Sequence, residues 1–340
     1  MQHWDLGVVA LDADLSPDDR LLAVTSESGR IPHKVGEQIL VSLELWDYRQ
    51  RKAEATTQLA SYRSSTVQPR PRPVRFTADG SLLAVADGTT VRVLEASTLK
   101  LVRLIQPALD PDWEINSVET SPVGHLAIIF SGGYERGHLF SYDLDTGHLL
   151  FSWNPPFDTT HSISWKPDGT QFAIAASRPC GGFGDIHVFG TNPWVQVETL
   201  KAPNSVSLAF SNDRLYAVRS GSCKGSVFHH HLGMEVFDTK GWKHLNPIWV
   251  KSKDIHDFVS FANGRLVADT GGLRTEHNWL DATSWGVATN VQVTVWNGDA
   301  ESFASSFPIS PPVRILKLRL SRTARMLLEL GSRPQLFELP

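Results

Sequence analysis

Three consecutive histidines, His229-His230-His231, are the most obvious candidate metal ligands in the sequence. Adjacent side chains point in different directions, so a contiguous triple rarely supplies more than two ligands to one ion, and His33 or His277 would have to complete the set. The two cysteines, Cys180 and Cys223, do not have the paired spacing of a zinc site. We therefore expect a solvated histidine segment and two free thiols, with a Cys180–Cys223 disulfide as the alternative.

A second set of polar residues stands at the start of short apolar runs that are spread along the chain. Its members are Arg72, Glu114, Asn116, His161, Asn204, Asp254, His256 and Arg314. Calcium and magnesium prefer carboxylate and amide oxygens, so Glu114, Asn116, Asn204 and Asp254 could hold a divalent cation if the fold brings them together. Such a site would support a metal-dependent hydrolase. The sequence has no Gly-x-Ser-x-Gly element and no phosphate-binding loop, so nothing in it supports serine hydrolysis or nucleotide binding.

Arginine, histidine and aromatic residues occur in the longer segments between the apolar runs, at 26–38, 131–137, 177–184, 220–233 and 271–290. The residues that we assign to a partner-binding face are Arg30, His33, Tyr134, Arg136, Arg178, Phe183, His230, Arg274, His277, Trp279 and Trp285. Exposed aromatic and arginine side chains dominate the energetics of protein interfaces, and long loops on a rigid scaffold usually carry binding. The alternative for Trp279 and Trp285 is that they cover a hydrophobic edge.

These candidates are positioned by a module that recurs along the chain. Each module has an apolar run, a turn containing Pro, Asp, Asn or Gly, a second apolar run, a connection, and a third run that ends in a large apolar residue. The turn residues Ala78, Pro122, Pro167 and Asn212 are 44, 45 and 45 residues apart. The runs are short and rich in Val, Ile and Phe, so they predict strands, and this period is typical of four-stranded propeller blades.

Seven such modules can be counted, and the last one ends after three strands, at 313–320, 325–330 and 335–339. Trp4–Val9 precedes the first module and would supply the missing outer strand, which removes an exposed sheet edge. We predict an all-β fold, a single seven-bladed β-propeller over residues 1–340 with four-stranded antiparallel blades. The blades are expected at about 10–60, 72–106, 114–154, 160–200, 204–249, 255–308 and 312–340 plus 3–9.

The segments Phe76–Val85 and Leu45-Trp46-Asp47 resemble WD40 repeats, and the resemblance covers essentially the whole chain. It implies the propeller fold and says little about function. The sequence departs from the family because no Gly-His pair precedes the first strand of a blade. Gly124-His125, Gly137-His138 and Gly147-His148 all fall elsewhere in the module. The family's buried His–Ser–Asp network therefore cannot be assigned, and we expect blade stability to depend more on apolar packing between sheets.

Charged residues also occupy one repeated position in the first strand of several modules. In circular order, Arg319, Asp14, Arg75 and Glu119 alternate in sign over four consecutive blades. Unpaired charges are costly when they are buried, so we predict a line of ion pairs between blades near the propeller axis. The alternative is that each charge points into a water-filled channel.

The net charge of −4 argues against a dedicated nucleic-acid binder, and no apolar stretch is long enough to span a bilayer. No leader is visible at the N-terminus, so we expect a cytoplasmic monomer, with a secreted or periplasmic protein that has lost its leader as the alternative. We favour a non-catalytic scaffold that binds a protein or peptide and has no resident cofactor. There are two alternatives. One is a metal-dependent hydrolase or lactonase at the mouth of the central channel, which the polar set from Arg72 to Arg314 would surround. The other is a small-ligand or glycan sensor.

Overall fold

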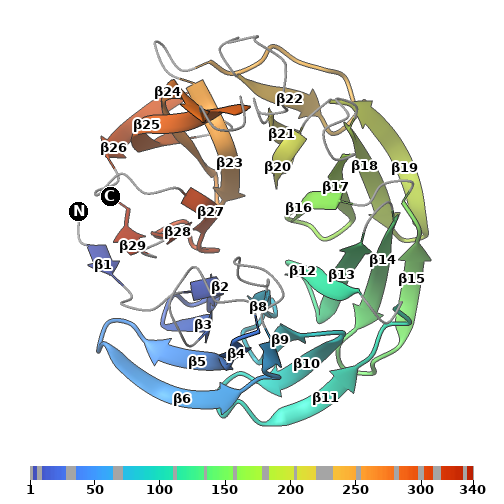
Figure 1. Ribbon diagram of the computed structural model, residues 1–340. Helices are drawn as coiled ribbons and strands as arrows, with labels where there is room; N and C mark the ends of the chain where they lie inside the picture. The colour runs from blue at the N-terminus through green and yellow to red at the C-terminus, as the bar shows by residue number, and fades with distance from the viewer. Residues whose placement is uncertain are drawn as a thin grey trace. The chain divides into compact units, whose positions relative to one another are not determined.

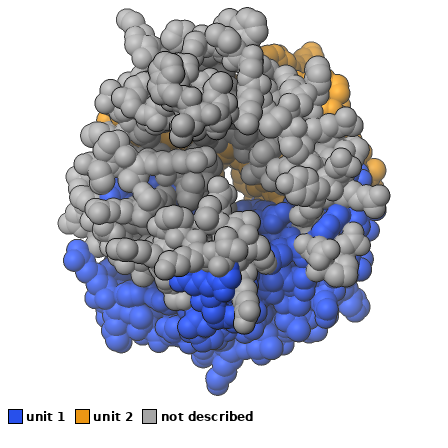
Figure 2. Space-filling view, viewed as in Figure 1, with its two compact units in different colours: residues 1–156, 321–340 blue, residues 157–320 orange. Residues whose placement is uncertain are grey.

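The computed structural model describes residues 3–5, 10–27, 36–63, 72–109, 113–133, 136–155, 159–177, 184–202, 205–219, 233–249, 254–278, 283–297, 302–308, 315–331 and 335–339. The chain divides into two compact units, which Figure 2 shows in blue and orange. Unit 1 comprises residues 1–156 and 321–340, and unit 2 comprises residues 157–320. Among the described residues, no helix is long and apolar enough to cross a membrane.

Unit 1 contains the first three blades and the strands of the two chain ends (Figure 1). Blade 1 has the order β2-β3-β5-β6, blade 2 has β11-β10-β9-β8, and blade 3 has β12-β13-β14-β15. The bounds are β2 Ala10–Leu15, β3 Leu21–Glu27, β5 Val41–Asp47, β6 Lys52–Gln58, β8 Val74–Phe76, β9 Leu82–Asp87, β10 Thr90–Glu95, β11 Leu101–Ile105, β12 Glu114–Thr120, β13 Leu126–Gly133, β14 Arg136–Asp143 and β15 Leu149–Trp153. A separate pair joins β4 (Gln38–Ile39) to β7 (Tyr62–Arg63).

Unit 2 contains blades 4, 5 and 6 and the inner strand β27 (Ile315–Leu320). Blade 4 has the order β16-β17-β18-β19, blade 5 has the three strands β20-β21-β22, and blade 6 has β23-β24-β25-β26. The bounds are β16 Thr159–Trp165, β17 Gln171–Ser177, β18 Gly184–Thr191, β19 Trp194–Lys201, β20 Ser205–Phe210, β21 Arg214–Arg219, β22 Met234–Asp238, β23 Asp254–Ala262, β24 Arg265–Asn278, β25 Thr283–Asn297 and β26 Ser302–Pro308.

The two ends of the chain meet in one sheet, as predicted. β1 (His3–Asp5) pairs antiparallel with β29 (Gln335–Glu338), and Trp4 lies opposite Leu336. β29 in turn pairs with β28 (Met326–Gly331). Together with the antiparallel sheets of the other modules, this arrangement confirms the predicted seven-bladed β-propeller class.

The hydrophobic core lies between neighbouring sheets rather than in one central mass. Leu43 and Leu45 of blade 1 pack against Phe76 and Leu83 of blade 2. Similar clusters join blades 2 and 3, blades 4 and 5, blades 5 and 6, and the chain-end sheet with blade 1. Each of these five pairs of neighbouring sheets is therefore joined by apolar side chains.

The turn between strands β9 and β10 is a two-residue hairpin turn. Asp87 pairs with Thr90, so the two central residues of the turn are Gly88 and Thr89. Gly88 has a φ of 70°, which glycine adopts without a steric cost. The Asp87 side chain accepts the backbone N–H of Ala60 and pairs with Arg92, which explains why an aspartate ends the strand.

Short polar side chains on the innermost strands accept hydrogen bonds from backbone N–H groups of the next blade. In unit 1, an oxygen of Asp14 accepts the N–H of Phe76 at 2.9 Å. In unit 2, Ser164 Oγ accepts the N–H of Phe210 and Ser260 Oγ accepts the N–H of Leu320, both at 3.1 Å. An innermost strand is the edge of its own sheet, so its outward N–H groups need acceptors once they are buried.

A second row of acceptors lies two residues earlier on β2 and β16, and β20 contributes a further member. Asp12 Oδ2 accepts the N–H of Val74, Ser162 Oγ accepts that of Leu208, and Ser207 Oγ accepts that of Val259. The donor–acceptor distances are 3.1 to 3.2 Å. The blades are thus joined near the axis by side chain to backbone hydrogen bonds in addition to their apolar faces.

Arg75 forms the predicted ion pair with Glu119 and a second ion pair with Asp12, which was not predicted. Its side chain is 1 % exposed, and its Nη2 lies 2.7 Å from Glu119 Oε1. On the other side its Nη1 contacts Asp12 Oδ2 rather than the expected Asp14, whose carboxylate accepts the N–H of Phe76. Burial alone would lower the pKa of the guanidinium, but Asp12, Glu119 and Asp14 outweigh it and raise the pKa. Arg319, the remaining member of the predicted line, lies in unit 2.

Replacing Arg75 with Met should destabilise the fold strongly, because the change leaves two buried carboxylates without their cation. We expect a loss of about 3–5 kcal/mol in the free energy of unfolding, measured by urea titration. Lys52→Met is the matched control, since Lys52 and Glu54 form an exposed pair whose loss should cost at most about 1 kcal/mol. Equal stabilities of the two variants would show that the Arg75 pairs contribute nothing.

His125 joins blades 2 and 3 at their surface. Its Nε2 lies 3.0 Å from Asp79 Oδ2, and its Nδ1 lies 2.7 Å from Asp145 Oδ1. Burial lowers the pKa of this imidazole, but the hydrogen bonds with Asp145 and Asp79 outweigh burial and raise it. The protonated form thus stabilises the fold, and this contribution is present at acid pH and is lost as the pH rises through the raised pKa.

Glu329 is a carboxyl group inside the chain-end sheet. It is fully buried in β28, opposite Gln335 in β29, while its neighbours Leu328 and Leu330 pack against blade 1. Within the described residues neither of its carboxyl oxygens has a hydrogen-bond partner. Burial raises its pKa from 4.5 to about 8, so the group stays protonated in the folded protein at neutral pH.

Replacing Glu329 with Gln should remove a pH dependence while keeping the shape of the side chain. Unfolding the wild type at pH 5–8 releases the Glu329 proton, so its stability falls as the pH rises, by at most about 1.4 kcal/mol per pH unit. The free energy of unfolding of E329Q minus that of the wild type should therefore increase from pH 5 to pH 8. Denaturant titrations of both proteins measure this difference, and the His125 contribution cancels in it. A difference that does not change with pH would contradict a raised pKa.

Candidate functional site

Two residues of the predicted channel mouth lie together, and they are engaged with each other. Arg72 Nη1 is 3.6 Å from Glu114 Oε2, and the guanidinium lies over the ring of Tyr62 at 5.4 Å. The Arg72 side chain is 2 % exposed, and its backbone oxygen accepts a hydrogen bond from Thr25 Oγ1. Arg72 therefore joins blades 1, 2 and 3, and so little of its guanidinium is accessible that it offers no surface to a ligand.

The other members of this set are placed only in part. Asn116 is exposed at a register irregularity of β12, between Ile115 and Ser117. His161 lies in β16, and Asp254 and His256 lie in β23, all of unit 2. Asn204 and Arg314 lie outside the described residues. The described part of the chain contains no group of three metal-binding side chains, and the cation site at the channel mouth stays a prediction.

Most of the predicted partner-binding face lies outside the described residues. This holds for Arg30, His33, Tyr134, Arg178, Phe183, His230 and Trp279, and also for Cys180 and Cys223. The four remaining residues of the face lie in strands rather than loops. Arg136 begins β14, Arg274 and His277 belong to β24, and Trp285 belongs to β25.

The expected loop at 271–290 is wrong, because this segment continues the strands of blade 6. β23 pairs with β24 as far as Gly271, and β26 pairs with β25 as far as Gln292. The pairing of β24 with β25 continues beyond these residues, from Gly272–Thr289 to Asn278–Thr283. Residues 272–278 and 283–289 thus form a two-stranded projection, which we call the ribbon. It contains Thr275, Thr283, Thr289, Trp285 and Val287, and these residue types favour strands.

The ribbon carries three of the predicted partner-binding residues at fixed places in its register. Arg274 lies opposite Val287, His277 lies opposite Ser284, and Trp285 lies opposite Glu276. In the described residues neither β23 nor β26 pairs with this part of the sheet. The backbone N–H and C=O groups along the outer sides of the ribbon can therefore meet an extended segment of another chain.

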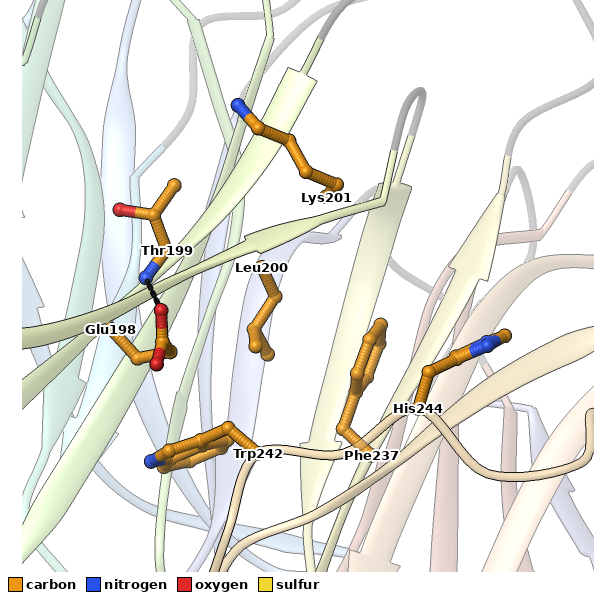
Figure 3. Close-up of a pocket in the computed structure, with 7 residues that line it drawn as sticks. All are labelled: Glu198, Thr199, Leu200, Lys201, Phe237, Trp242 and His244. Carbon is orange, nitrogen blue, oxygen red and sulfur yellow. Dashed lines mark hydrogen bonds between the residues drawn. The ribbon is translucent and has the colours of Figure 1, made fainter.

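A groove between the outer strands of blades 4 and 5 is a site that the sequence reasoning missed. Its volume is about 370 Å³, and its lining residues are Glu198, Thr199, Leu200, Lys201, Phe237, Trp242 and His244. Figure 3 shows Glu198, Leu200, Phe237 and Trp242 around one space, with the ends of Lys201 and His244 directed away from it. The floor is apolar, since Leu200 and Phe237 are buried.

The groove exists because, among the described residues of blade 5, no regular outer strand follows β22. Beyond β22 the chain makes a turn with a positive φ at Trp242, and it returns with single bridges at His244 and Ile248. Trp242 packs edge-on against Phe210, with ring centroids 6.3 Å apart. The weak apolar pattern at 241–249 was the only signal in the sequence that this edge is irregular.

Glu198 is the charged residue of the groove that has one carboxylate oxygen available for a ligand. Its Oε1 accepts the backbone N–H of Thr199 at 2.8 Å, and no cation among the described residues pairs with it. Lys201 pairs with Asp185 at 2.7 Å, and His244 contacts Glu235. The arrangement can therefore bind a cation beside an aromatic ring.

No protein-family model matches the chain, and no curated protein matches it in sequence. Solved structures do resemble it over nearly the whole length. A chain in the crystal structure of the mitotic checkpoint complex has a TM-score of 0.67 and 13 % identity, with 99 % of this chain and 91 % of that chain covered. The Pan2 WD40 domain of Neurospora crassa has a TM-score of 0.63 and 12 % identity, with 98 % and 90 % covered. Likeness at this identity concerns the fold, and the chain is a WD40-like β-propeller.

Proposed function

We propose that this protein is a non-catalytic scaffold that binds a protein or peptide partner. The observation that carries the proposal is the ribbon, because it projects beyond the other strands of blade 6 and bears Arg274, His277 and Trp285. A pair of strands without sheet neighbours is a ready partner for an extended peptide, which can add its own backbone to the sheet. The two solved structures come from a mitotic checkpoint complex and from a WD40 domain, so they support the scaffold class and do not indicate a particular partner.

Exposed apolar side chains on outer strands support the same proposal. Leu101 and Leu104 of β11 are 59 % and 52 % exposed, and Leu149 of β15 is 51 % exposed. These strands belong to neighbouring blades of unit 1, and the guanidinium of Arg103 donates a hydrogen bond to the backbone oxygen of Asp145, just before β15. Apolar side chains that gather on a soluble surface commonly mark a protein contact.

The proposal is tested by shortening the ribbon. Residues 273–288 are replaced by Asn-Gly, so that the paired residues Gly272 and Thr289 are joined by a two-residue hairpin turn. Because neither β23 nor β26 pairs with the removed part, the midpoint of thermal unfolding should stay within a few degrees of that of the wild type. Affinity capture from native extract, quantified by mass spectrometry, should show a partner that the wild type retains and the shortened variant loses at least about tenfold.

Glu54→Gln on the exposed outer strand β6 is the control, and it should capture the same partner as the wild type. Equal capture by the folded, shortened variant would contradict the role of the ribbon. A stoichiometric divalent ion in the purified protein, with a hydrolytic activity lost in Glu114→Gln, would favour the metal-dependent hydrolase instead.

A further inference from the structure

We propose that the groove between blades 4 and 5 binds an arginine side chain of a partner peptide. The inference rests on the proposed scaffold function and names the chemistry of one contact that the scaffold makes. It depends on four side chains, Glu198, Leu200, Phe237 and Trp242, which come from two neighbouring blades of unit 2.

The charges of the groove favour a cation. Lys201 is neutralised by Asp185 on the adjacent strand β18, with 2.7 Å between Nζ and Oδ2. His244 is held by Glu235, and so it adds no free positive charge to the groove. Glu198 remains as a carboxylate whose Oε1 accepts the N–H of Thr199, and its other oxygen can accept a hydrogen bond from a ligand. An anionic ligand would be repelled at this place.

The shape and the aromatic ring favour arginine among cations. The indole of Trp242 packs edge-on against Phe210, with an angle of 78° between the rings, and this contact orients the indole. A guanidinium is flat, can stack on an aromatic face, and can donate two parallel hydrogen bonds to one carboxylate. A lysine ammonium is a point charge that is more strongly hydrated. The aliphatic stem of an arginine would lie along Leu200 and Phe237, whose side chains are 5 % and 3 % exposed.

Leu200, Phe237 and Trp242 belong to the apolar cluster that joins blades 4 and 5, whereas Glu198 is not part of that cluster. A substitution of Glu198 removes one hydrogen bond to a neighbouring backbone N–H, so the fold should tolerate it. The site can therefore be tested without unfolding the protein.

The experiment follows the indole N–H signal of Trp242 by NMR in the full-length protein, with W242F used to assign the signal. N-acetyl-arginine amide is titrated, and N-acetyl-citrulline amide, which has the same shape and no charge, is the matched control. We expect the arginine derivative to shift the Trp242 signal in a saturable way and the citrulline derivative to leave it unchanged. In E198Q the dissociation constant for the arginine derivative should rise roughly three- to tenfold, while E54Q on β6 should bind as the wild type does.

Three results would overturn the proposal. They are the absence of a shift, an equal shift with the citrulline derivative, and undiminished binding in folded E198Q. Binding of N-acetyl-lysine amide with the same affinity would overturn the assignment to arginine. The two proposals can fail separately. If the shortened ribbon loses a captured partner and the arginine derivative does not shift the Trp242 signal, the scaffold function is supported and only the arginine site is refuted.

Discussion

The constraint on which the structure depends is the unpaired backbone of each innermost strand. Every blade presents the edge of its sheet to the axis side, and burial of that edge requires an acceptor for each outward N–H. Asp14, Ser164 and Ser260 meet this requirement for Phe76, Phe210 and Leu320. Leaving such a group without a partner would cost about 1–3 kcal/mol. The polar residues of the inner strands are therefore explained by the backbone that they satisfy, before any ligand is considered.

The charged residues near the axis follow from the same constraint. Asp12 accepts the N–H of Val74 and also contacts Arg75, and Arg75 in turn binds Glu119 on blade 3. A buried carboxylate that accepts a backbone N–H needs a cation, and the cation then needs its second carboxylate. The result is a chain of charges through three blades. Arg72 and Glu114 form a further ion pair, so these two residues of the predicted channel mouth are part of the scaffold.

The sequence was sufficient for the fold because the repeat and the turn residues are local signals. Pro17, Ala78 and Pro167 mark turns between paired strands, and Trp4 pairs where the incomplete last module required it. The sequence predicted the Arg75–Glu119 pair, but it could not separate Asp12 from Asp14, since both precede the same turn and only the strand register decides which one faces Arg75.

The candidate binding elements were harder to predict because they arise from irregular register and not from the repeat. A long segment between two apolar runs predicts a loop. In the structure, however, residues 272–278 pair with residues 283–289, beyond the last residues that pair with β23 and β26. Glu198 and Trp242 come from different modules, and they meet because blade 5 has no regular fourth strand to fill the space. The described inner strands are held by buried hydrogen bonds, whereas the ribbon extends beyond the ends of β23 and β26 and the groove lies beside the outer part of blade 5. Neither candidate binding element therefore contains the acceptors that join the inner strands.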